Sequence, residues 1–265
     1  MWPGLQAVAR KFQDKPVLFL AVNSGTPRLQ VQSYLRKNRV TWPAIADTDR
    51  SFERGCGVPP ISLKNIYQVR IMKPDGKLLS TSPTRMEQSL SGVVGAAKWN
   101  VDPEGIPATL KTAWFHIEFG NFAMAANVLK KAGNSRKTDT KQGAQKLLDY
   151  VGEKMNKQIE SAKTAESDGK MWEAYRGYSD AAIRYKGYDL PKDIVATINK
   201  LKGNADVKKE VTALRILAAA KRKLYGKTIS ARKSGYRSLE RLIDQQSETQ
   251  AAQEAQRLIK ALGMP

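Results

Sequence analysis

The arrangement expected for the first hundred residues is decided by one stretch, VTWPAIADTDRSFERGCGV (residues 40–58). Its apolar start is typical of a short buried strand, and a turn and a short helix around residues 51–54 are expected to follow. Toward the N-terminus, the continuous apolar run PVLFLAVN (16–23) predicts a second buried strand. Apolar residues at helical spacing predict one helix before this strand and one after it: Leu5, Val8, Ala9 and Phe12, then Leu29, Val31, Tyr34 and Leu35.

In the C-terminal direction, YQVRIMKPDGKLLS (67–80) predicts a β-hairpin. Polar and apolar residues alternate over 68–71, which is the period of a strand with two different faces. Pro74 and Gly76 favour a turn between the two strands, because proline presets φ and glycine accepts a positive φ.

A final helix is expected over about 85–98, so helices and strands alternate through residues 1–99 and predict an α/β domain. The ordered set PVLFLAVN, VTWPAIADTDRSFERGCGV and VRIMKPDGKLL resembles the thioredoxin fold, and more narrowly the TlpA/ResA-type thiol–disulfide oxidoreductases and the AhpC/TSA redoxins. The resemblance covers about residues 1–98. It implies thiol–disulfide exchange and a location in the bacterial periplasm or envelope.

The same resemblance places the catalytic cysteines of that family outside this sequence. In the family a CxxC pair begins the helix that precedes the strand LFLAVN, and Met1-Trp2-Pro3-Gly4-Leu5 matches the part that follows the pair. The cysteines and the central strand of the sheet would therefore lie upstream of Met1. We expect either that Met1 is not the true start, or that the domain is an incomplete thioredoxin-like fold. In both cases the chain as written has no catalytic residue for redox chemistry.

Four residues remain candidates for the redox groove that the resemblance implies. Counting back from the Asp-Gly turn, the cis-proline position of the family falls near Tyr67, whereas Pro59 and Pro60 come before an insertion, ISLKNI (61–66). The resemblance therefore makes Tyr67, Pro59 and Pro60 candidates for lining the groove. Cys56 lies between two glycines and is either a reactive thiol or a small residue at a helix end.

Residues 100–265 are expected to form an all-α helical-hairpin domain, because apolar residues recur there at helical spacing. Breaks near Gly120, Gly169 and Gly226 each lie between segments in which small and aromatic residues alternate. This pattern resembles tetratricopeptide-type hairpins, although the breaks are 49 and 57 residues apart and that family repeats after about 34 residues. Generic antiparallel hairpins give the same pattern.

Two longer helices are expected in this half, over about 139–167 and 190–224. Between them, Trp172, Tyr175 and Tyr178 recur on one helical face. These aromatic residues are either a platform for a peptide or a sugar, or packing between hairpins.

Composition excludes several classes of site. One Cys and one His exclude a disulfide within the chain, a cysteine-rich zinc site and a multi-histidine metal centre. No metal or cofactor is expected. No apolar run reaches the roughly 18 residues of a membrane-spanning helix, and the residues after Met1 show no signal peptide.

The charge is the unusual feature of the composition, with a formal net charge of +20 at pH 7. Residues 1–99 carry 15 basic and 6 acidic residues, and residues 100–265 carry 30 and 19. Such an excess favours an acidic partner or a polyanion, or serves solubility alone. The densest basic cluster lies in residues 221–241, where Glu240 is the single acid. Its candidates for binding a polyanion, on what is otherwise a solvated helix face, are Lys221, Arg222, Lys223, Lys227, Arg232, Lys233, Arg237 and Arg241.

Two kinds of function follow from these observations. The resemblance implies a redox-inactive relative of envelope thiol–disulfide oxidoreductases. The residues themselves are also compatible with a non-enzymatic scaffold whose helical half binds another protein or a peptide, or with a basic protein that binds a polyanion.

Overall fold

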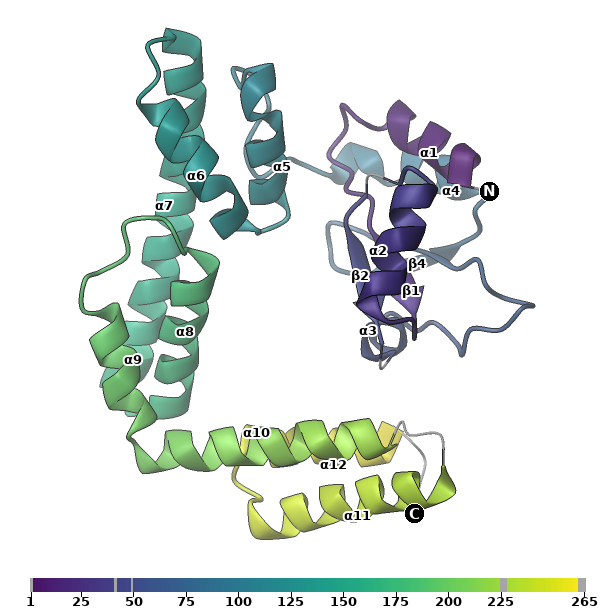
Figure 1. Cartoon of the computed structure of the whole chain (residues 1–265), viewed down its shortest axis with the longest axis vertical. Helices are drawn as coiled ribbons and strands as arrows, with labels where there is room; N and C mark the ends of the chain where they lie inside the picture. The colour runs from purple at the N-terminus through teal and green to yellow at the C-terminus, as the bar shows by residue number, and fades with distance from the viewer. Residues whose placement is uncertain (1, 41, 49, 225–227, 262–265) are drawn as a thin grey trace. The chain divides into compact units, whose positions relative to one another are not determined.

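The computed structural model of the chain describes residues 2–40, 42–48, 50–224 and 228–261 (Figure 1). They divide into two compact units, Met1–Asn100 and Val101–Pro265. Each unit has a hydrophobic core of its own.

The N-terminal unit consists of short helices and short strands. In chain order its elements are α1 (Trp2–Lys11), β1 (Ala21–Ser24), α2 (Arg28–Lys37), β2 (Ala44–Asp47), α3 (Ser51–Gly55), β3 (Val69–Met72), β4 (Leu78–Thr81), α4 (Met86–Ser91) and the 3₁₀ turn η1 (Val94–Ala96). The strands form two separate two-stranded sheets. β1 and β2 are parallel, with Ala21 opposite Ala44, and β3 and β4 are antiparallel, with Val69 opposite Thr81.

The α/β thioredoxin-like domain expected over residues 1–99 is therefore wrong. Helices dominate the described residues, each strand has four residues, and each sheet has two strands, whereas an α/β domain packs its helices on one continuous, mostly parallel sheet. In the apolar run 16–23, only the residues from Ala21 onward enter a strand. Leu20 and Val22 are 40% and 39% exposed. A central parallel strand is buried on both faces, and this one is not. The apolar content of the run therefore predicted a longer and more deeply buried strand than the structure has.

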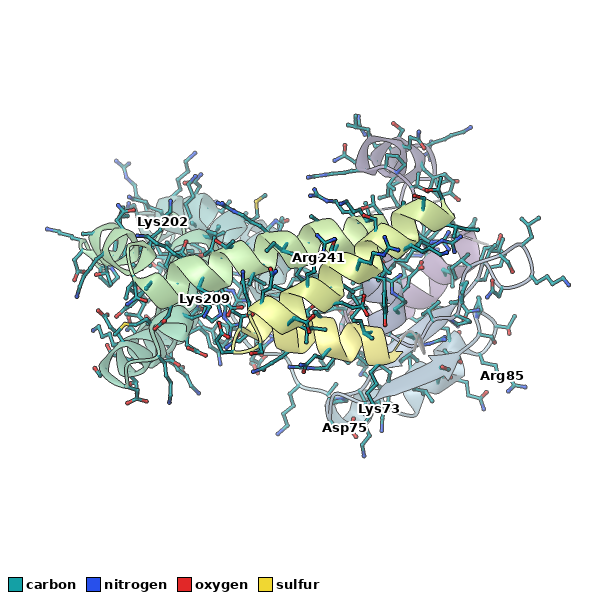
Figure 2. All side chains as sticks on the ribbon, turned by 90° about the horizontal axis from the view of Figure 1, so that it is seen from below. Lys73, Asp75, Arg85, Lys202, Lys209 and Arg241 are labelled. Atoms are coloured by element: carbon teal, nitrogen blue, oxygen red, sulfur yellow. The ribbon has the colours of Figure 1, made fainter. Side chains whose placement is uncertain are left out.

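The hairpin expected over 67–80 is confirmed by β3 and β4. Gly76 occupies the turn with a φ of +79°, a conformation that glycine adopts without strain. The backbone N–H of Lys77 donates to Asp75 Oδ1 at 3.0 Å, and this bond holds the pKa of the Asp75 carboxyl below its ordinary value. Figure 2 shows Lys73 and Asp75 side by side at this turn. The hairpin contributes Ile71 to a small core with Phe12, Met86 and Leu90.

Every described element of the second unit is helical. In chain order these are the 3₁₀ turn η2 (Ala108–Leu110), α5 (Lys111–Glu118), α6 (Phe122–Gly133), α7 (Thr138–Ser167), α8 (Met171–Arg184), α9 (Ile194–Lys202), α10 (Ala205–Leu224), α11 (Ile229–Gln245) and α12 (Gln250–Ala261). Each helix from α5 to α9 packs against the next, and α10, α11 and α12 pack together (Figure 1).

Two of the three expected glycine turns are confirmed. Gly120 joins α5 to α6 and Gly169 joins α7 to α8, with φ of +71° and +75°; Gly226 lies outside the described residues. The helix expected over 139–167 is confirmed as α7, whereas the stretch 190–224 divides into α9 and α10.

Polar side chains explain where helices of this unit begin. Asn204 separates α9 from α10, and its Oδ1 accepts the backbone N–H of Asp206 at 2.9 Å, which caps α10. Glu210 of α10 is 5% exposed and accepts the backbone N–H groups of Gln250 and Ala251, both at 2.9 Å. These two N–H groups begin α12 and have no partner inside the helix, so Glu210 joins the start of α12 to α10.

Candidate binding groove in the helical unit

The four candidates of the N-terminal unit lie in or beside one irregular segment, between α3 and β3. Pro59 and Pro60 are exposed, and the side chain of Tyr67 is 54% exposed. Cys56 follows α3 as its C-cap residue, is partly buried and is a free thiol. The Pro60 carbonyl accepts a bond from Asn65 Nδ2 at 3.0 Å.

The basic cluster of residues 221–241 spreads over the end of α10 and the length of α11. Lys221 forms an ion pair with Glu254 of α12, and Lys227 lies outside the described residues. Arg222 and Lys223 are exposed in the last turn of α10, where the helix dipole favours positive charge. The members on α11 are exposed: Arg232, Lys233, Arg237 and Arg241.

Carboxylates interrupt this cluster on the surface of α11. Figure 2 shows α11 alongside α10 and α12, with Arg241 labelled. A hollow of about 500 Å³ between α11 and α12 is lined by Arg237 and Arg241, but also by Glu240 and Asp244. The two signs of charge cancel there. The positive charge of the cluster is therefore less continuous on the surface than it is along the sequence.

A second hollow, of about 570 Å³, lies along α7 and α8; we call it the α7–α8 groove. It is lined by Phe122, Lys154, Lys157, Gln158, Ser161, Ala162, Ala165, Glu173, Arg176, Gly177, Asp180, Arg184 and Tyr185. On each of the two helices these residues recur at intervals of three and four, so they share one face of the helix.

Small residues bring the two helices together beneath this groove. A Cβ at Gly177 would lie 2.8 Å from the Cβ of Ala162, so only glycine permits this approach. Gln158 Nε2 donates to the Gly177 carbonyl oxygen at 3.2 Å, which ties α7 to α8 at the same level.

Four cations and two carboxylates line the groove: Lys154, Lys157, Arg176 and Arg184, with Glu173 and Asp180. Lys154 Nζ lies 5.1 Å from the centre of the Tyr150 ring, within reach of a cation–π contact. Glu173 Oε1 accepts from Gln250 Nε2 at 2.7 Å and so contacts the start of α12.

Aromatic rings close one end of the groove. Phe122 and Tyr185 stack with their ring centres 5.2 Å apart and are 6% and 1% exposed. The hydroxyl of Tyr188 donates to the Phe122 carbonyl oxygen at 2.9 Å, and burial raises the pKa of Tyr188 to about 12. Both aromatic rings of the groove lining, Phe122 and Tyr185, are therefore buried.

The aromatic residues singled out on α8 mainly pack between helices. Trp172 and Tyr175 stack at 5.8 Å, and Trp172 Nε1 donates to Gln250 Oε1 at 3.2 Å. Tyr178 is 6% exposed and donates to Glu166 Oε2 at 3.3 Å. Burial, with the Glu166 charge adding to it, raises the pKa of Tyr178 to about 12. These contacts support packing rather than an open platform.

Sequence reasoning missed the groove cations because they are scattered along the chain. Lys154 and Lys157 are three residues apart on α7, while Arg176 and Arg184 come from the next helix. The spacing of basic residues on the predicted helix 139–167 was a usable signal for the first pair. Nothing in the sequence showed that α8 places its cations beside them.

The groove offers charged and hydrogen-bonding groups. Its described lining contains neither His nor Cys. Over the part of the chain that the structure describes, no three or more His, Cys, Asp or Glu side chains gather as a metal ion would need. Among the described helices, none is both long enough and apolar enough to cross a membrane.

Comparison of the chain with protein-family models, with curated proteins and with solved structures finds no match.

Proposed function

We propose that the helical unit is a non-enzymatic binding module, and that the α7–α8 groove holds a segment of a partner protein. The observation that carries the proposal is the groove itself, a hollow of about 570 Å³ with polar and charged groups from two helices. The two packed helices fix the backbone positions from which these side chains extend, which lowers the entropy lost when a ligand binds.

The dimensions of the groove suit an extended chain. Its lining follows α7 from Lys154 to Ala165, which is about 17 Å at roughly 1.5 Å per residue. An extended peptide rises by about 3.4 Å per residue. The groove therefore holds about five residues of such a peptide.

The experiment is a selection of random peptides displayed on phage against the full chain. Peptides that bind are then measured against two variants of α7. Ser161 is exposed and lines the groove, so Ser161→Trp fills it; Thr164 is exposed on the same helix outside the groove, so Thr164→Trp is the matched control.

We expect Ser161→Trp to weaken binding by at least tenfold and Thr164→Trp to leave the affinity within about twofold. The proposal fails if the library yields no binder, or if the selected peptides bind Ser161→Trp as tightly as the parent chain.

A further inference from the structure

We propose that the segment bound in the α7–α8 groove is acidic, with Asp or Glu side chains that contact Lys154, Lys157 and Arg176. This inference rests on the proposed function and adds the chemistry of the ligand to it.

Among the described residues, Lys154, Lys157 and Arg176 lack the carboxylate partners that nearby lysines have. Lys163 pairs with Glu160 at 2.7 Å, Lys170 with Asp168 at 3.0 Å and Lys200 with Glu166 at 3.4 Å, all around the C-terminal part of α7.

Within the described residues, no ion pair joins Lys154, Lys157 or Arg176 to a carboxylate of the chain. A ligand that supplies carboxylates completes the same charge pairing in the groove.

The charged residues differ from one end of the groove to the other. Gln158 contacts Gly177, and α8 returns along α7 after the turn at Gly169. Lys154 therefore lies toward the Arg184 end, next to the Phe122–Tyr185 stack. Glu173 lies at the opposite end and is already held by Gln250. Arg176 lies on α8 between these ends, three residues from Glu173, so the acidic side chains of the ligand belong between the Phe122–Tyr185 end and Arg176.

The lining of the groove suits a peptide better than a nucleic acid. A single strand binds by stacking its bases on exposed aromatic faces, but the Phe122 and Tyr185 rings are 6% and 1% exposed. Glu173 and Asp180 in the lining repel phosphates and carboxylates alike, but a peptide, unlike a nucleic acid strand, also carries backbone N–H groups at every residue that can donate to these two side chains. An acidic peptide satisfies both signs of charge in the groove.

The experiment measures the binding of two fluorescein-labelled decapeptides to the full chain by fluorescence anisotropy. One peptide alternates Glu with Ser, and the other has Gln in place of every Glu. The groove variant is Lys157→Glu with Arg176→Glu. The control variant is Lys141→Glu with Lys208→Glu, two exposed lysines outside the groove, which gives the same change in net charge.

We expect the Glu peptide to bind the parent chain about tenfold more tightly than the Gln peptide. This ratio of affinities corresponds to the combined free energy of two or three partly exposed ion pairs. The groove variant loses this preference, and the control variant keeps it within about twofold. Thermal unfolding tests whether both variants are folded. If the groove variant is unfolded, Lys157→Gln with Arg176→Gln replaces it, and Lys141→Gln with Lys208→Gln becomes its control.

Three results would overturn the inference: equal affinities of the two peptides, equal losses in the groove and control variants, or a single-stranded oligonucleotide that binds the groove more tightly than the Glu peptide. Library peptides that bind the groove without an excess of Asp or Glu would overturn the acidic ligand and leave the proposed function intact. A phage library that yields no binder would overturn both the acidic ligand and the proposed function.

Discussion

At the scale of single residues, glycine sets how closely two pairs of helices approach. A Cβ at Gly177 would meet the side chain of Ala162, at 2.8 Å. A Cβ at Gly235 would lie 2.5 Å from the backbone nitrogen of Leu224 and 2.8 Å from the carbonyl oxygen of Ala220. Backbone atoms of a packed helix yield less than a side chain does, so Gly235 is the stricter requirement.

We therefore expect Gly235→Ala to lower the free energy of unfolding by about 1–3 kcal/mol, because α11 must move away from α10. Guanidinium unfolding followed by circular dichroism measures the change. Gly152 on α7 has open space around its Cβ position, so Gly152→Ala is the control and should be neutral or stabilising by up to about 1 kcal/mol. Equal losses in the two variants would contradict the close contact of α11 with α10.

Two buried tyrosines predict how stability depends on pH. Burial raises the pKa of Tyr188 to about 12, and burial together with Glu166 raises that of Tyr178 to about 12. The ordinary pKa of both side chains is 10.0. Between pH 10 and 12 the unfolded chain therefore loses these protons before the folded chain does. The stabilisation is present in full below pH 10 and is lost as the pH rises toward 12.

We expect the free energy of unfolding to fall between pH 9 and pH 11, and to fall less steeply in Tyr188→Phe. Urea unfolding at the two pH values measures both slopes. The lost hydrogen bond to the Phe122 carbonyl oxygen lowers stability at every pH, so only the difference between the slopes reports the ionisation. An unchanged slope would contradict the raised pKa of Tyr188.

At the scale of elements, local signals located helices and turns well and the sheet poorly. The Asp-Gly turn predicted β3 and β4, and the glycines at 120 and 169 predicted two helical hairpins. The thioredoxin-like sheet failed because a strand depends on partners that are distant in the sequence. The division of 190–224 at Asn204 was missed, although a capping residue followed by Asp206 and an apolar period is a known helix start.

Glu210 gives a prediction for α12. In Glu210→Gln, a single amide oxygen replaces two carboxylate oxygens, and an NH₂ group faces one backbone N–H. We expect a loss of about 1–3 kcal/mol, because a buried donor is left without an acceptor. Hydrogen exchange at Gln250 and Ala251 should be faster. Glu254→Gln removes only the exposed pair with Lys221 and should cost less than about 1 kcal/mol.

At the scale of the whole molecule, the chain divides into two units with separate cores. The core of the N-terminal unit is small, and its two-stranded sheets contribute little stability by themselves. The helical unit contains long helices with fully buried residues such as Leu147, Val151 and Leu239. The two units should therefore unfold at different denaturant concentrations.

Two matched core substitutions in the full chain test this division. Leu147→Ala removes a side chain that is 0% exposed, and Ile71→Ala removes one that is 8% exposed in the other unit. We expect each to lower the stability of its own unit by about 2–5 kcal/mol. Hydrogen exchange measured by mass spectrometry reads the two units separately. Equal effects of either substitution on both units would show one cooperative domain instead.

The sequence by itself determined the helices of the second half, the hairpin over 67–80 and the basic excess, because periodicity, turn residues and charge act over a few neighbouring positions. Tertiary structure alone decided whether the strands share one sheet and which cations meet. The sequence pointed to residues 221–241 by their density along the chain. The α7–α8 groove instead brings Lys154 toward Arg184, thirty positions away. Only the packing of one helix on another creates such a site, because charges on different helices meet through space.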